Sequence, residues 1–179
     1  MTGRADQGFT LIELLIVVAI ISVIAAIAVP RLGVARMTAY ETSAIGSLRS
    51  TALAQVSYSS TWGNGGYASS YAILGTPTPG TTEGFISPDL GHAPPVIKSG
   101  YTFNMAPGAG SVAGPNDGAG NPTITSWIAT AVPQTPGQTG TRAFAVNQGI
   151  TIWQNTAGAG TAAPTEPFTT SATVSPVSR

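Results

Sequence analysis

The residues whose types could do chemistry are few in this sequence and lie far apart. There is no cysteine, so thiolate catalysis, a disulfide framework and cysteine-ligated metals are excluded. His92 is the only histidine, and a zinc site or catalytic triad needs partners that do not accompany it. The acidic residues of the C-terminal two thirds occur singly, at Glu83, Asp89, Asp117 and Glu166. We therefore expect no catalytic residue, no metal site, no cofactor and no enzymatic activity.

Glu13 is the charged residue in the most unusual place. It interrupts an apolar run from Phe9 to Val29 that otherwise contains only Thr10 and Ser22 as polar residues. As a helix rising about 1.5 Å per residue, this run would be about 31 Å long, close to the roughly 30 Å of a bilayer core. The run is therefore long enough to cross a membrane.

A carboxylate inside such a span needs a reason. It costs about 2.5–3.5 kcal/mol on insertion, which apolar residues contributing about 0.3–0.6 kcal/mol each can offset. Intramembrane charges usually have a partner, and the nearest basic residues are Arg4 and, past the far end, Arg31 and Arg36. A plain single-span anchor, the simplest interpretation of the run, gains nothing from Glu13.

A secretory signal peptide is a second interpretation of the same run. Residues 26–28 could mimic its small-residue cleavage site. However, the apolar run is long for a signal peptide, Pro30 and Arg31 follow it at once, and the preceding flank is barely basic.

The residues Gly8-Phe9-Thr10-Leu11-Ile12-Glu13 resemble the processing site of type IV prepilins and type II secretion pseudopilins. The resemblance implies that residues 1–8 are a leader peptide, that a prepilin peptidase cuts between Gly8 and Phe9, and that the new N-terminal Phe9 is methylated. Glu13 becomes the fifth mature residue, where this family keeps its glutamate. Pro30 becomes the twenty-second, where the family commonly has proline.

The same resemblance supplies a partner for Glu13. Cleavage creates a positive amine at Phe9, which in this family is thought to face the glutamate of a neighbouring subunit inside the filament. At about 4 Å and an effective dielectric near 20, such a pair attracts by about 4 kcal/mol before desolvation. Burial costs offset much of that gain. Glu13, together with Pro30, is thus expected to set register and docking during assembly more than net stability.

The elements that carry these residues form a long N-terminal helix. Residues 9–30 form a hydrophobic transmembrane and assembly helix, and residues 31–60 an amphipathic helix that continues it. Pro30 either ends the helix at the membrane surface or kinks a helix that goes on, and the helical pattern after it favours the second. The apolar face of the second half is formed by Ile45, Leu48, Ala52 and Val56.

Residues 61–154 are expected to form a head domain, and residues 155–179 a low-complexity, extended tail. The head begins with a Gly-, Pro-, Ser- and Thr-rich connection in the place of the family's αβ-loop. Four strands are predicted by alternating apolar residues at Ser99–Met105, Thr123–Val132, Arg142–Val146 and Ile150–Gln154, the last two forming a hairpin. The predicted fold class is α+β: a long N-terminal helix packed on a small antiparallel sheet of about four strands, the pilin fold.

The resemblance implies a structural subunit of a type IV pilus (fimbrium) that polymerises into a helical homo-oligomer and serves adhesion, motility or surface attachment. The expected partners are the prepilin peptidase, the pilus assembly platform and the inner membrane, with the assembled pilus outside the cell. A pseudopilin of a type II secretion system is the first alternative, and a DNA-uptake pilin the second. Seven basic residues balance seven acidic ones, so composition gives no strong nucleic-acid signal.

Overall fold

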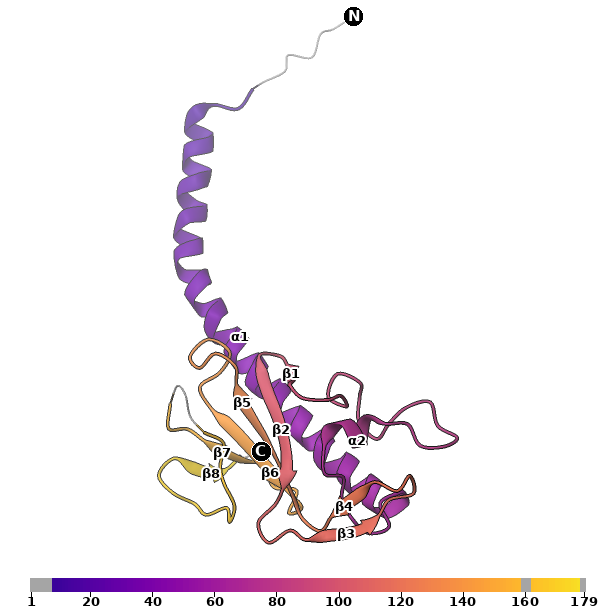
Figure 1. Cartoon of the computed structure of the whole chain (residues 1–179). Coiled ribbons are helices and arrows are strands. Elements are labelled where there is room, and N and C mark those ends of the chain that lie inside the picture. Colours follow the sequence, from indigo (N-terminus) through magenta and orange to yellow (C-terminus); the bar gives the residue numbers. More distant parts are fainter. Residues whose placement is uncertain (1–7, 159–161, 178–179) are drawn as a thin grey trace, which may run out of the picture. The chain divides into compact units, whose positions relative to one another are not determined.

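The computed structural model describes residues 8–158 and 162–177. The chain divides into two compact units, one ending at Arg36 and the other starting at Met37. Helix α1, Leu11–Thr61, contributes to both and is the longest element at 51 residues (Figure 1). The expected leader, residues 1–8, lies outside the described residues except for Gly8.

The first unit is the N-terminal part of α1. The helix runs through Pro30 without interruption, so the prediction that it continues beyond the proline is confirmed. Every large apolar side chain from Phe9 to Val34 is 50–86% exposed. Among the described residues, α1 is the one helix with a stretch long and apolar enough to cross a membrane, and none of that stretch is buried within the chain. Covering for these side chains must therefore come from outside the chain.

The second unit contains a six-stranded antiparallel sheet in the order β1-β2-β5-β6-β7-β8. These strands are Val96–Lys98, Tyr101–Pro107, Trp127–Pro133, Ala143–Asn147, Trp153–Asn155 and Val174–Pro176. A separate two-stranded sheet pairs β3, Ala113–Asn116, with β4, Pro122–Ile124. A short helix α2, Tyr71–Gly75, precedes β1. The α+β fold class is confirmed, but the expected count of about four strands is too low.

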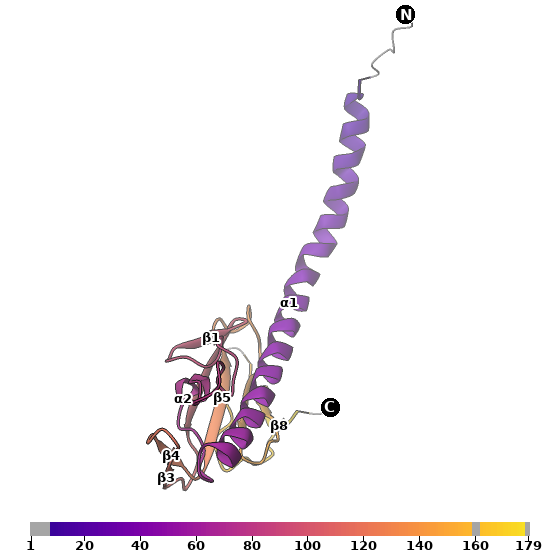
Figure 2. The same cartoon turned by 90° about the vertical axis from the view of Figure 1, so that its right-hand side faces the viewer.

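The core lies between one face of the sheet and the C-terminal half of α1, which runs along the sheet in Figure 2. Buried residues alternate along β2 and β5, and Trp127 is fully buried. The centre of the buried face of α1 is a stripe with spacings of three and four residues, formed by Glu41, Ala44, Leu48, Thr51, Gln55 and Tyr58. Half of this stripe is polar, because the head supplies a hydrogen-bond partner for each of the longer polar side chains.

The apolar face predicted for this half of α1 is therefore correct only in part. Leu48 and Ala52 are buried and Ile45 is half-buried, but Val56 is 46% exposed. Gln55 takes the buried position instead. Its amide donates to the carbonyl of Ala68 at 2.8 Å and accepts from the N–H of Ala68 at 2.9 Å. Such a doubly bonded amide can be buried at little cost, which hydrophobic periodicity does not reveal.

The segment expected to be an extended tail also departs from the prediction, because part of it belongs to the sheet. Val174–Pro176 forms β8 and pairs with β7. Phe168 stacks on Trp153 with ring centroids 5.5 Å apart. Glu166 accepts hydrogen bonds from the N–H of Ala109 and from the side chain of Asn147. A few anchors thus hold a sequence of mostly small residues against the outer face and edge of the sheet.

Candidate processing and assembly site

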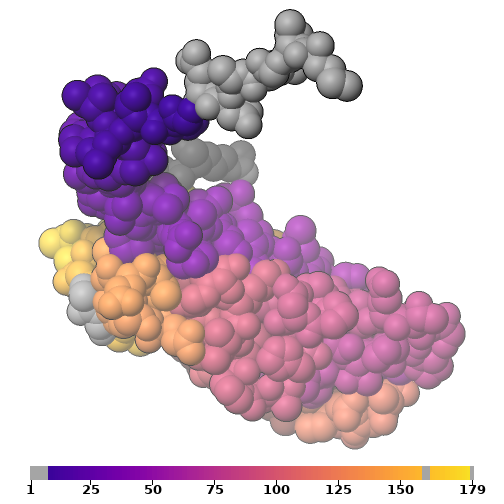
Figure 3. Space-filling view, turned by 90° about the horizontal axis from the view of Figure 1, so that it is seen from above, coloured from indigo at the N-terminus to yellow at the C-terminus, as the bar shows by residue number. Residues whose placement is uncertain are grey.

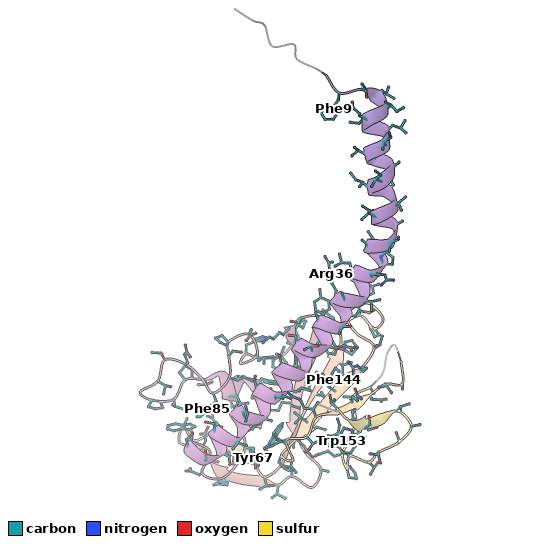
Figure 4. All side chains as sticks on the ribbon, turned by 180° about the vertical axis from the view of Figure 1, so that it is seen from behind. Phe9, Arg36, Tyr67, Phe85, Phe144 and Trp153 are labelled. Atoms are coloured by element: carbon teal, nitrogen blue, oxygen red, sulfur yellow. The ribbon has the colours of Figure 1, made fainter. Side chains whose placement is uncertain are left out.

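The expected cleavage site lies immediately before α1. Gly8 and Phe9 are exposed, and Figure 4 shows Phe9 at the N-terminal end of the helix. A Cβ atom added to Gly8 would meet nothing within 4 Å, and the residue does not have a positive φ. The fold therefore gives no reason for a glycine at this position. If a glycine is needed here, the need belongs to a protein that acts on the chain.

Thr10 and Glu13 form a reciprocal cap at the start of α1. The Glu13 carboxylate accepts from the Thr10 N–H at 3.0 Å and from the Thr10 hydroxyl at 2.7 Å. In return, the Glu13 N–H donates to the Thr10 hydroxyl oxygen at 3.2 Å. This is a capping box, in which two backbone donors that would otherwise lack partners are satisfied. This cap was not predicted from the sequence, although Thr-x-x-Glu before an apolar run is its usual signature.

The cap shows what Glu13 does within one chain. Its hydrogen-bond partner is Thr10 alone, and neither of the two salt bridges among the described residues involves it. The carboxylate also lies in the first helical turn, where the helix dipole favours negative charge. A counter-charge for Glu13 is therefore absent from the described part of the chain, and the nearest place to create one is the backbone nitrogen of Phe9.

Pro30, the second residue expected to act in assembly, is far from this site. It lies 17 positions after Glu13 on the same helix, or about 26 Å along the axis at about 1.5 Å per residue. The structure thus brings Phe9, Thr10 and Glu13 together and leaves Pro30 apart. Any joint effect of Glu13 and Pro30 has to be exerted through different neighbours.

Glu41 is a buried charge that was not singled out from the sequence. Only 6% exposed, it accepts from the backbone N–H groups of Thr141 at 2.8 Å and of Arg142 at 3.2 Å. The Arg142 guanidinium donates to it through Nε at 2.8 Å and Nη2 at 2.6 Å. Arg142 also donates to Gln154 on β7. This ion pair fastens α1 to the segment that leads into β6 and, through Gln154, to β7.

The Glu41 ion pair predicts an acid-sensitive head. Burial alone would raise the pKa of Glu41, but the Thr141 N–H and the Arg142 guanidinium outweigh it and hold the pKa below the usual 4.5. A lowered pKa in the folded state stabilises the fold above pH 4.5, and that contribution is lost as the pH falls through the folded-state pKa. We expect the denaturant concentration at the unfolding midpoint to decrease as the pH is lowered below 4.5, and to decrease less in the Glu41→Gln variant. Equal acid sensitivity in both proteins would contradict this.

The scattered acidic residues and His92 do not form a second site. Asp89 pairs with Lys98 at 2.6 Å, and His92 is exposed. Asp117 is buried, which alone would raise its pKa, but hydrogen bonds from Asn121, Tyr58 and Ala119 lower it. Within residues 8–158 and 162–177, no three His, Asp or Glu side chains come close enough to hold a metal ion.

Comparison with known proteins agrees with the geometry at the N-terminus. Residues 3–29 match the family model of the prokaryotic N-terminal methylation motif, which is typical of type IV pilins and pseudopilins. No curated protein and no solved structure matches the chain. The resemblance stated from the sequence is thereby confirmed. The chain has the N-terminus of a type IV pilin-like or pseudopilin-like precursor, and this motif implies processing by prepilin peptidase and association with a membrane.

Proposed function

We propose that the chain is the structural, non-enzymatic subunit of a type IV pilus. Residues 1–8 are removed by prepilin peptidase, Phe9 is methylated, and the assembly platform then moves the subunit from the inner membrane into a filament outside the cell. The filament serves adhesion, motility or surface attachment. The observation that carries the proposal is the uncovered apolar part of α1 with a carboxylate at its start.

A membrane covers the apolar side chains, but it does not account for Glu13. Removal of the leader places a positive amine at Phe9, four residues before Glu13, and gives each subunit one charge of each sign at the start of the helix. Packing the helices of many copies side by side covers the apolar surface and lets each carboxylate meet the amine of a neighbour. Both features of the segment are then used by one process.

Cleavage is tested by Gly8→Ala. Because a Cβ atom at Gly8 meets no described atom within 4 Å, we expect normal membrane insertion but uncleaved precursor, detected by intact mass and N-terminal sequencing. Gly33→Ala is the matched control, since its Cβ atom also enters open space while the position lies far from the cut. The control should be cleaved like the wild type. Full cleavage of Gly8→Ala would overturn the assignment of this residue.

Filament formation is tested by electron microscopy of material sheared from cells that express the chain with its peptidase. Long surface filaments whose subunits begin at a methylated Phe9 would support a pilus. Cleaved subunits that stay in the cell envelope would support the pseudopilin alternative instead. Cleaved subunits that never associate would overturn both.

A further inference from the structure

In the second unit, two charged side chains of opposite sign are left without a partner. Arg49 and Glu83 make no side-chain hydrogen bond or ion pair among the described residues. Every other Asp, Glu, Lys and Arg described from Met37 onwards has one. These paired residues are Glu41, Asp89, Lys98, Asp117, Arg142 and Glu166.

Arg49 stands at the edge of an open groove of about 410 Å³. The groove is lined by Arg49 and Leu53 of α1, by residues 150–152 of the turn between β6 and β7, and by Val177. Leu53 is 65% exposed and Ile150 is 50% exposed, so the groove presents apolar side chains to the outside. A ligand for it should be apolar with one negative charge.

The backbone conformation of Ile150 is a second, independent observation that points to the groove. Its φ is 61°, in the left-handed region where a β-branched residue is a true outlier, whereas asparagine or glycine is accommodated there. The strained residue is half exposed and gains little packing inside the chain. Such outliers are found where the surroundings or a function require them.

The loop that carries Glu83 has the properties expected of a ligand for this groove. Between α2 and β1, residues 76–83 are nearly all exposed and include Pro77 and Pro79. A tight turn from Thr78 to Thr81, with the Thr81 N–H donating to the Thr78 carbonyl at 2.9 Å and Gly80 at a φ of 90°, fixes the tip. The loop is therefore a preformed projection with apolar prolines and a single carboxylate, so docking it costs little conformational entropy.

The groove and the loop cannot meet within one chain. In Figure 1 the loop after α2 projects away from β7 and β8, and in Figure 4 Phe85 and Trp153 lie on opposite sides of α1. The surface in Figure 3 has the magenta residues that follow α1 at one end of this unit and the yellow C-terminal residues at the other. A contact between them joins two copies through different surfaces. Contacts of this kind leave a free copy of each surface at the two ends, and they continue as an open helix wherever the rotation between copies does not close a ring.

We propose that the groove of one copy binds the 76–83 loop of a second copy, with Arg49 paired to Glu83. The proposal rests on the proposed function, and it adds a contact between head domains to the packing of the apolar helices. The partner is a second copy because this chain itself carries both the groove with its unpaired cation and the loop with its unpaired anion.

A charge exchange in the full chain, expressed with its peptidase, tests the contact. Arg49→Glu and Glu83→Arg alone should each reduce sheared filaments about tenfold or more, because like charges then face each other. The double variant should restore them. The control is Asp89→Lys combined with Lys98→Asp, which exchanges the charges of an existing ion pair outside the contact and should leave filament yield close to that of the wild type. Loss in both single variants without recovery in the double variant would overturn the pairing.

Two further variants distinguish loss of the contact from misfolding of the head. Ile150→Asn relieves the strained backbone, so the head should be at least as stable while filament yield falls. The chain has no cysteine, so Leu53→Cys combined with Thr82→Cys should give oxidised ladders beyond the dimer, whereas each single variant gives no ladder. If the wild type forms filaments but the double-cysteine variant gives no ladder, the contact is overturned and the proposed function is not. Absence of wild-type filaments would overturn the proposed function.

Discussion

Filaments should be absent from cells that carry Glu13→Ala, although the precursor is still inserted and cleaved. Removing the carboxylate takes away an insertion penalty of about 2.5–3.5 kcal/mol, so membrane insertion becomes easier. What is lost is the anion that the amine of a neighbouring Phe9 is proposed to meet. Membrane fractionation, intact mass and electron microscopy of sheared material measure the three steps separately. Normal filaments from this variant would overturn the assembly role of Glu13.

The capping box makes a sharper version of this experiment possible. Glu13→Gln keeps an acceptor that can cap Thr10 but removes the charge. Thr10→Ala removes the cap and keeps the charge. We expect Glu13→Gln to block filaments like the alanine variant, while Thr10→Ala still forms them. The opposite pattern would show that Glu13 acts by starting the helix and not by its charge.

Loss of the Arg142 side chain should destabilise the head domain by about 2–4 kcal/mol, somewhat less than the roughly 3–5 kcal/mol for breaking a fully buried ion pair, because Arg142 is 32% exposed. Arg142→Ala leaves the Glu41 carboxylate buried with only backbone and hydroxyl donors. Tryptophan fluorescence of the full chain in detergent measures the effect in a guanidinium titration. The fully buried Trp127 makes this signal sensitive to unfolding of the core.

Two further variants serve as controls for the stability of Arg142→Ala. Arg49→Ala removes an arginine from the exposed face of α1 and should change stability by less than about 0.5 kcal/mol. The double variant Glu41→Gln, Arg142→Ala should lose less unfolding free energy than the sum of the losses in its two single variants. In the double variant no buried charge is left without its partner. Additive losses would mean that Glu41 and Arg142 act independently.

The N-terminal methylation motif was predictable from the sequence because all of its information is local. Gly8, Phe9 and Glu13 lie within six positions, and the apolar run that carries them is continuous. The cap by Thr10 is equally local and has a recognisable signature, Thr-x-x-Glu, but it was not predicted. Helix continuation past Pro30 also followed from the pattern on both sides of it.

Features that depend on distant partners were not predictable in the same way. Glu41 looks like an ordinary exposed helix residue until the sheet brings Arg142, 101 positions later, against it. Gln55 is buried because the backbone of Ala68 pairs with its amide. β8 was missed because a three-residue strand among small residues has no alternating pattern. In each case the tertiary partner, and not the local composition, determines the outcome.

The two outer strands of the large sheet have a consequence for how subunits can be stored. β1 and β8 are each three residues long, and they carry Lys98 and Pro176. Short edges with lysine or proline are poor templates for adding another strand. In the pilus subunit proposed above, heads crowded together on a membrane would therefore resist amyloid-like joining through their sheets, and the unassembled subunits would stay dispersed until their helices leave the lipid.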